Sequence, residues 1–166
     1  MKRWAVGLLI LVTFLIQAVV MPSFAVSGIK PNLLLILAVA VAVTYGSYAG
    51  LFVGAVGGAV QDIVFGRYIG LFTLTGALAG FLVGLVERRV FKEHLVMQVT
   101  LTFGAAALNN LVVFAFLKAF GVDLPFLMSL WHVVIGEAVY DAVLAPAMFA
   151  LVSRLALTHG EEDAEA

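Results

Sequence analysis

The sequence contains no cysteine and unusually few charged residues. Without cysteine the chain has no disulfides, no thiolate metal ligands and no thiol nucleophile. Charged residues make up 11% of the 166 residues, whereas a soluble domain carries about a quarter. Hydrophobic residues make up 64%, and the mean hydropathy is +1.16. The polar surface of a soluble domain is therefore missing, and most side chains must face lipid or other helices.

The few charged residues are unevenly distributed. The net charge is −1, but four of the ten acids lie in the last six residues, namely Glu161, Glu162, Asp163 and Glu165. The sequence contains no basic run that would indicate nucleic-acid binding. The chain from Thr158 onward is acidic and has no apolar face. We therefore expect one membrane domain, residues 1–157, followed by a disordered cytoplasmic tail, residues 158–166.

Six apolar stretches predict an all-α integral membrane protein with six transmembrane helices. We expect these helices at about residues 4–25, 32–45, 48–65, 70–87, 95–120 and 127–153. A single helix from Asn32 to Phe65 would be about 50 Å long, against a hydrocarbon core of about 30 Å. The expected break between two helices is therefore Tyr45-Gly46-Ser47-Tyr48.

The first apolar stretch has a second interpretation. Lys2 and Arg3 precede the run from Trp4 to Met21, and Ser23-Phe24-Ala25 resembles a signal-peptidase site. The run is longer than a typical signal segment and long enough to span a bilayer. We expect a retained first helix, with a cleaved signal peptide as the alternative.

The cations predict the orientation of the six spans. An even number of spans places both termini on one side, together with the loop at residues 87–94. That side holds Lys2, Arg3, Arg88, Arg89, Lys92 and Arg154, and the opposite side holds Lys30, Arg67 and Lys118. The positive-inside rule therefore places both termini and the basic loop (Arg88, Arg89, Lys92) in the cytoplasm.

Glycines recur every four residues on two of the expected helices. The third helix has Gly46, Gly50, Gly54 and Gly58, and the fourth has Gly76, Gly80 and Gly84. Residues four apart share a helix face, so each helix presents a groove without side chains. Such grooves allow close backbone approach in lipid, which indicates tight helix packing or, alternatively, docking of a partner's helix.

Polar residues also lie within the expected spans. They are Gln17, Gln61, Asp62, Asn109, Asn110, His132, Glu137 and Asp141. In the six-span topology His132 lies near the outer surface, Glu137 one turn deeper and Asp141 near the midplane. Glu137 and Asp141 are four residues apart and share a helix face. If the faces converge, then Gln61, Asp62, Asn109, Asn110, Glu137 and Asp141 line a polar notch that opens to the outside.

Asp141 has three interpretations. A bare carboxylate at the bilayer centre costs at least about 2.5–3.5 kcal/mol, and no lysine or arginine lies at matching depth. We therefore expect Asp141 to be protonated and to donate to an asparagine such as Asn109. The first interpretation is an interhelical clamp, the second is a binding notch or partner site, and the third is a proton or cation relay. A relay would need a continuous path to both sides of the membrane.

The sequence offers no basis for catalysis. The serines lie at helix ends, with no histidine placed to activate one. His94, His132 and His159 fall in different boundary regions, which argues against a metal cluster. Gly57-Gly58 lies within a span and lacks the lysine of a P-loop. We therefore predict no enzyme, no catalytic or metal site and no cofactor.

Several stretches together resemble the bacterial rod shape-determining MreD family. They are Lys30-Pro31-Asn32-Leu33-Leu34-Leu35-Ile36, the glycines from Gly50 to Gly58 with Gln61-Asp62, Gly66 to Leu71, Arg88-Arg89-Val90-Phe91, and Glu137 to Pro146. The similarity covers roughly residues 30–154. The family usually has asparagine where this chain has Asp141. Protonated aspartic acid has nearly the same hydrogen-bonding capacity, so this difference agrees with a neutral Asp141.

The resemblance implies a non-catalytic scaffold or regulator of bacterial cell elongation and peptidoglycan synthesis. Such a protein lies in the plasma (inner) membrane, binds MreC and works with MreB, RodA and a class B penicillin-binding protein. The family's helices are expected to resemble the substrate-binding membrane subunits of energy-coupling-factor transporters. A substrate-binding subunit of a vitamin-type transporter is therefore the main alternative, and a minor lipid or ion transporter is a weaker one. The sequence leaves open the oligomeric state, including a homodimer.

Overall fold

The structure is a computed structural model that describes residues 3–25, 28–64, 70–87, 95–122 and 134–162. Within these residues it contains α-helices and one short 3₁₀ helix. In chain order they are α1 (Arg3–Val19), η1 (Met21–Phe24), α2 (Leu33–Tyr45), α3 (Ser47–Val64), α4 (Leu71–Glu87), α5 (Leu95–Ala119) and α7 (Gly136–Glu162). The all-helical prediction is therefore confirmed.

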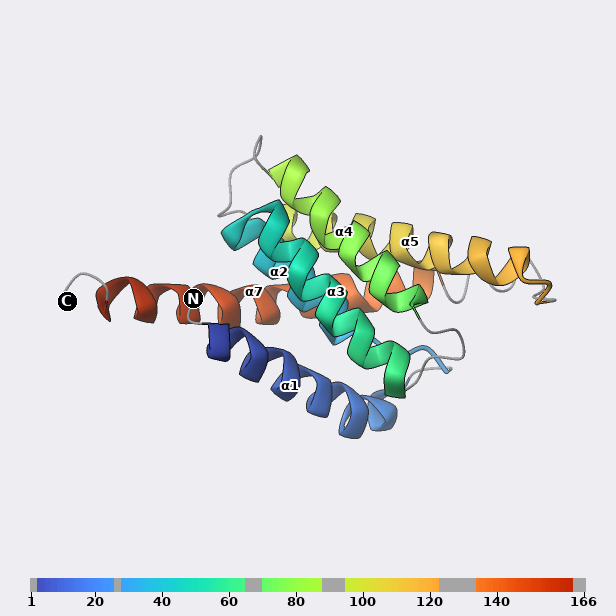
Figure 1. Ribbon diagram of the computed structural model, residues 1–166, viewed down its shortest axis with the longest axis horizontal. Helices are drawn as coiled ribbons and strands as arrows, with labels where there is room; N and C mark the ends of the chain where they lie inside the picture. Colours follow the sequence, from blue (N-terminus) through green and yellow to red (C-terminus); the bar gives the residue numbers. More distant parts are fainter. Residues whose placement is uncertain (1–2, 26–27, 65–69, 88–94, 123–133, 163–166) are drawn as a thin grey trace.

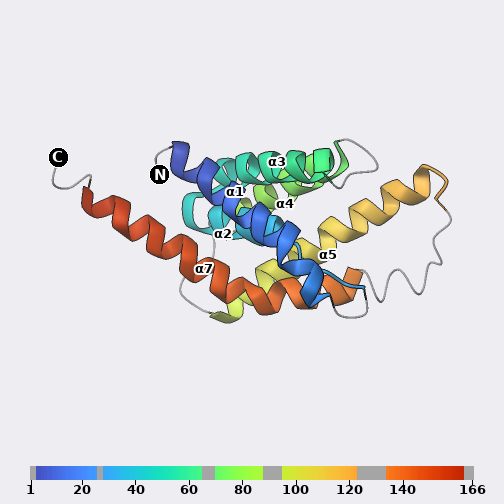
Figure 2. The same cartoon turned by 90° about the horizontal axis from the view of Figure 1, so that it is seen from below.

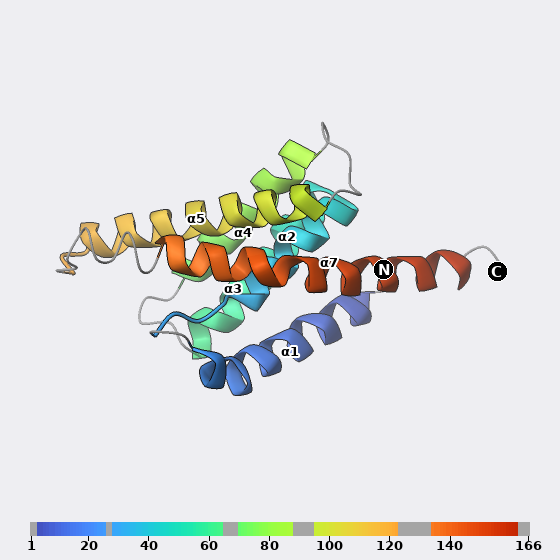
Figure 3. The same cartoon turned by 180° about the vertical axis from the view of Figure 1, so that it is seen from behind.

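Helix α2 is the centre of the bundle. Figures 1 and 3 show it between the α3–α4 pair on one side and α5 and α7 on the other, and it contacts all four of these helices. Every residue from Leu33 to Val43 is buried. A helix that is apolar all round buries all its faces, and the uninterrupted run of Leu, Ile, Val and Ala in α2 has this character.

The chain reverses direction between α2 and α3 at the expected position. α2 ends at Tyr45 and α3 begins at Ser47, and Gly46 between them has φ 94°. Glycine adopts this left-handed conformation without steric cost, and other residues rarely do. The predicted break at Tyr45-Gly46-Ser47-Tyr48 is thus confirmed.

Within the described residues, three helices are long and apolar enough to cross a membrane, namely α3, α5 and residues Gly136–Leu155 of α7. Shorter apolar helices cover Val6–Val19, Leu33–Tyr45 and Leu71–Val86. At about 1.5 Å per residue, the 13 residues of α2 span about 20 Å, which is less than a hydrocarbon core of about 30 Å. Helix α2 is therefore shorter than the hydrocarbon core, so neighbouring parts of the chain must surround its ends.

Helix α7 differs most from the expected boundaries. It is described from Gly136, so residues 127–133 of the expected helix lie outside the described residues. It continues to Glu162, which includes five residues assigned above to a disordered tail. Residues 163–166 of that tail are not described. Figure 2 shows that α7 bends along its length, and Pro146 lies inside the helix, where it removes a backbone hydrogen bond.

Candidate functional site

The N-terminus of α2 is held by its own N-cap and by side chains from α1 and α7. Asn32 is its N-cap, and the Asn32 side chain accepts a hydrogen bond from Leu35 N at 3.2 Å. Gln17 Oε1 of α1 accepts from Leu34 N at 3.0 Å. Asp141 Oδ1 of α7 accepts from Asn32 N at 2.7 Å. The first N–H groups of a helix have no partner within it, so each of these acceptors satisfies a group that would be costly to bury alone.

Gln61 connects α3 to the same helix end. Its Nε2 donates to Asn32 Oδ1 at 2.6 Å, so this oxygen accepts from both Leu35 N and Gln61. Gln61 and Asn32 are both buried. We call Gln17, Asn32, Gln61 and Asp141 the cap network. It joins α1, α3 and α7 to the start of the central helix.

Asp62, the neighbour of Gln61, caps a different helix. Its Oδ1 accepts from Phe72 N at 3.0 Å, and its Oδ2 accepts from Thr73 N at 2.9 Å and from Thr73 Oγ1 at 2.5 Å. Helix α4 begins beside Gly70, which has no side chain to act as a cap. Asp62 supplies the missing acceptor from α3, and its negative charge is favourable at the positive end of the helix dipole.

The polar residues expected to share one notch are divided between separate sites. Asp141 is bonded to the backbone of Asn32, and the expected hydrogen bond to Asn109 is not formed. Asn109 Nδ2 instead donates to Asn110 Oδ1 at 3.2 Å. Asn109 nevertheless lines a small void of about 10 Å³ that Asn32 and Gln61 also line.

Two of the expected notch residues lie close together beside this network. The Asn110 amide lies within reach of the Glu137 carboxyl group. Asn110 Nδ2 and Asp141 Oδ2 are buried, and neither makes a direct hydrogen bond in the described part of the chain. Next to Asp141, the Tyr140 hydroxyl donates to the carbonyl of Phe24 in η1 at 2.9 Å. Tyr140 and Asp141 are adjacent in α7, and they thus bind the two ends of the segment that connects η1 to α2.

The glycine stripes of α3 and α4 face each other. A Cβ placed on Gly54 would collide with the carbonyl oxygen of Gly76, and one placed on Gly80 would collide with that of Gly50. Gly58 and Gly84 are equally crowded, by the backbones of Phe72 and Ser47. Each helix therefore fills the groove of the other, as expected for packing through close backbone contact.

Some of the expected site residues lie outside the described part of the chain. They are the basic-loop residues Arg88, Arg89 and Lys92, together with His132. Other residues of the site were not among the sequence candidates: Asn32 and Thr73 were not, and Gln17 was noted only as a polar residue within a span. A signal for Asn32 was present, because asparagine directly before an apolar run is a typical N-cap.

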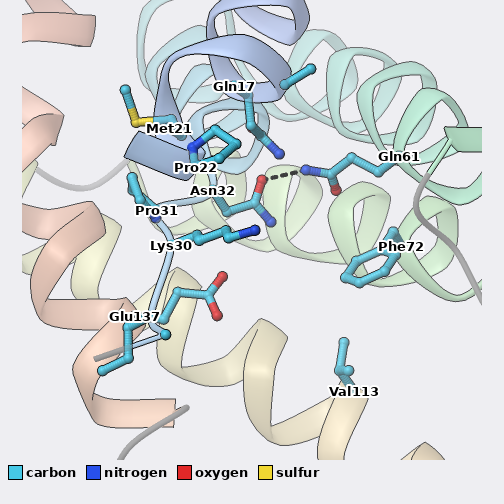
Figure 4. Close-up of a pocket in the computed structure, with 13 residues that line it drawn as sticks. Gln17, Met21, Pro22, Lys30, Pro31, Asn32, Gln61, Phe72, Val113 and Glu137 are labelled. Atoms are coloured by element: carbon cyan, nitrogen blue, oxygen red, sulfur yellow. Dashed lines mark hydrogen bonds between the residues drawn. The ribbon is translucent and has the colours of Figure 1, made fainter. Parts of the chain in front are cut away.

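A cavity of about 580 Å³ lies beside the cap network. We call it the end cavity, because its walls are the ends of α1, α3 and α5, the starts of α4 and α7, and the segment before α2. Figure 4 shows its polar side chains. The lining residues are Gln17, Ala18, Met21, Pro22, Gly28, Ile29, Lys30, Pro31, Asn32, Gln61, Phe72, Val113 and Glu137. Its volume is within the range of small-molecule sites.

The described residues show no arrangement suited to catalysis or to holding a metal ion. No group of three or more His, Asp or Glu residues within them could hold a metal. The buried carboxylates of Asp62 and Asp141 accept hydrogen bonds from helix N-termini. Polar side chains inside this bundle therefore fix helix ends and positions.

These features define a helical protein with several helices that could span a membrane, whose polar core residues hold its helices together. The family model of the rod shape-determining protein MreD matches residues 1–155. The chain belongs to the MreD family, a membrane family that determines rod shape without catalysis. No curated protein and no solved structure matches the chain.

Proposed function

We propose that this chain is a membrane scaffold of the cell-elongation complex, which binds MreC directly and acts with MreB, RodA and a class B penicillin-binding protein. Family membership supports the role in rod shape. The observation that supports a scaffold is the cap network, because it uses buried polar groups to join four helices. A scaffold needs a fixed surface, and buried hydrogen bonds between helices hold the helices in fixed positions.

The proposal includes six spans with both termini in the cytoplasm of the bacterial inner membrane. The charge distribution then places the end cavity and the cap network on the outer side. Lys30, which lines the cavity, is among the few cations assigned to that side. The extracytoplasmic side is also where peptidoglycan is assembled, so a partner's external domain would lie nearby.

The packing of α3 against α4 limits where a partner helix can dock. Both glycine stripes are used within the chain, and a side chain inserted between them would collide with backbone. We therefore infer that the single transmembrane helix of MreC docks on another face. Large apolar side chains are exposed elsewhere, for example Phe52, Ile63 and Val143.

Co-purification tests the scaffold proposal. The tagged full chain is extracted in mild detergent from cells that also produce MreC, RodA and the penicillin-binding protein. We expect MreC to elute with it, and Asp141→Leu to reduce the yield of the complex because a cap of the central helix is lost. Recovery of a bound vitamin or of an ATPase pair, without any single-pass cell-wall protein, would refute the scaffold and favour a transporter subunit.

A further inference from the structure

The end cavity carries two charged side chains that do not pair with each other. Lys30 comes from the segment before α2 and Glu137 from the start of α7, and both line the cavity (Figure 4). Within the described residues no ion pair joins them. Lys30 is exposed, whereas Glu137 is partly buried. A partly buried charge such as that of Glu137 is costly without a counter-charge, and a ligand that carries a positive charge removes this cost.

In three amide side chains of the cap network, only one of the two polar atoms takes part in the network. Gln17 accepts through Oε1, Asn32 accepts through Oδ1, and Gln61 donates through Nε2. Each amide group has both donor and acceptor atoms. Within the described residues, the nitrogens of Gln17 and Asn32 and the oxygen of Gln61 make no hydrogen bond, and all three residues line the cavity. Donors and acceptors are thus both available beside the two charges.

We propose that the end cavity binds a zwitterionic group that carries an anion and a primary ammonium. The anion, a phosphate or a carboxylate, accepts from Lys30 and from the amide nitrogens of Gln17 and Asn32. The ammonium donates to Glu137 and to Gln61 Oε1. An ammonium has three N–H donors and no acceptor, so carboxylate and amide oxygens suit it.

Apolar residues form the rest of the cavity wall. Met21, Pro22, Ile29, Phe72 and Val113 can pack against the uncharged part of the ligand. Phosphatidylethanolamine-type lipids and small free zwitterions share the required charges, and binding measurements distinguish them.

The test measures binding to the purified full chain by thermal shift and native mass spectrometry. The probes are dihexanoyl phosphatidylethanolamine, dihexanoyl phosphatidylglycerol with the same chains but no ammonium, and soluble glycerophosphoethanolamine. We expect the ethanolamine lipid to bind about tenfold more tightly than the glycerol lipid, since one charge-assisted contact is gained. Comparable binding of glycerophosphoethanolamine would support the site and assign it to a free zwitterion.

Two variants and one matched control complete the test. Glu137→Gln should remove the tenfold preference and leave binding of the glycerol lipid unchanged, and Lys30→Gln should weaken binding of both lipids. Lys118→Gln removes a positive charge as Lys30→Gln does, but Lys118 does not line the cavity, so this control should bind like the wild type. If Glu137→Gln does not fold, the Lys30→Gln variant still tests the site, because Lys30 is exposed.

Equal affinity of the wild type for both lipids, or an unchanged preference in folded Glu137→Gln, would overturn the proposal. Because binding is measured directly, the result does not depend on the scaffold role.

Discussion

Replacing two buried aspartates by asparagine should give opposite results. Asp141 and Asp62 are each only 0–2% exposed, and both accept hydrogen bonds from the start of another helix. In Asp141 only Oδ1 is bonded, and Oδ2 has no partner in the described residues. In Asp62 both oxygens are bonded, one to Phe72 N and the other to Thr73.

The magnitude follows from the atoms that asparagine retains. Asp141→Asn keeps an oxygen for Asn32 N and places its NH₂ where Oδ2 had no bond, so the free energy of unfolding should change by less than about 0.5 kcal/mol. Asp62→Asn puts a donor against a backbone N–H and should cost about 1–3 kcal/mol. Asp141→Leu leaves Asn32 N without an acceptor and should cost about 0.6–2 kcal/mol, as for an interhelical hydrogen bond in a membrane.

Unfolding in detergent and complementation of rod shape together check this prediction. We expect Asp141→Asn to support rod shape at normal expression, and Asp62→Asn and Asp141→Leu to unfold more readily. The reasoning would be refuted if Asp141→Asn abolished rod shape while folding normally. Neither asparagine nor leucine can exchange a proton, so that outcome would instead favour a relay through Asp141.

Three further predictions concern the whole bundle. Reporter fusions after Glu93 and at the C-terminus should both read cytoplasmic, and an external signal at either position contradicts six spans. Gly54→Leu should cost about 1–3 kcal/mol or more and lower the folded yield, because its side chain meets the Gly76 backbone. Gly104→Leu is the matched control, since nothing lies within 4 Å of its Cβ position, and equal yields of the two variants would contradict the packing. Gln17→Leu should lower the melting temperature in detergent by removing the acceptor of Leu34 N, and an unchanged melting temperature would show that this cap is dispensable.

The sequence predicted the helices well because their signals are local. Apolar run lengths and the glycine at position 46 determine where helices start and stop. The sequence did not predict the extension of α7 to Glu162, because the acidic composition of residues 158–166 indicated disorder. In the structure the preceding helix continues into this segment. The alternative of a cleaved first helix is a processing event, which the folded arrangement of α1 does not test.

The arrangement of the polar residues was harder to predict, because it depends on how each helix is rotated. Gln61 and Asp62 are consecutive, so their side chains point about 100° apart around α3 and could not both face one notch. They instead reach two helix starts, those of α2 and α4. Gly70 has no side chain that could cap α4, and this could have indicated that the first N–H groups of α4 need an acceptor from elsewhere. The partner of Asp141 could not be predicted from the sequence, because it is a backbone N–H 109 residues away.

The distance along the chain between Asp141 and Asn32 has a consequence for biogenesis. Helix α2 leaves the ribosome well before α7, but the acceptor for its Asn32 N–H belongs to α7, 109 residues further along the chain. During synthesis, water or translocon side chains must serve as temporary partners for the start of α2. Burial of this helix therefore completes only after translation of α7. Nascent chains that stop before residue 141 should be recognised as incomplete and degraded by membrane proteases.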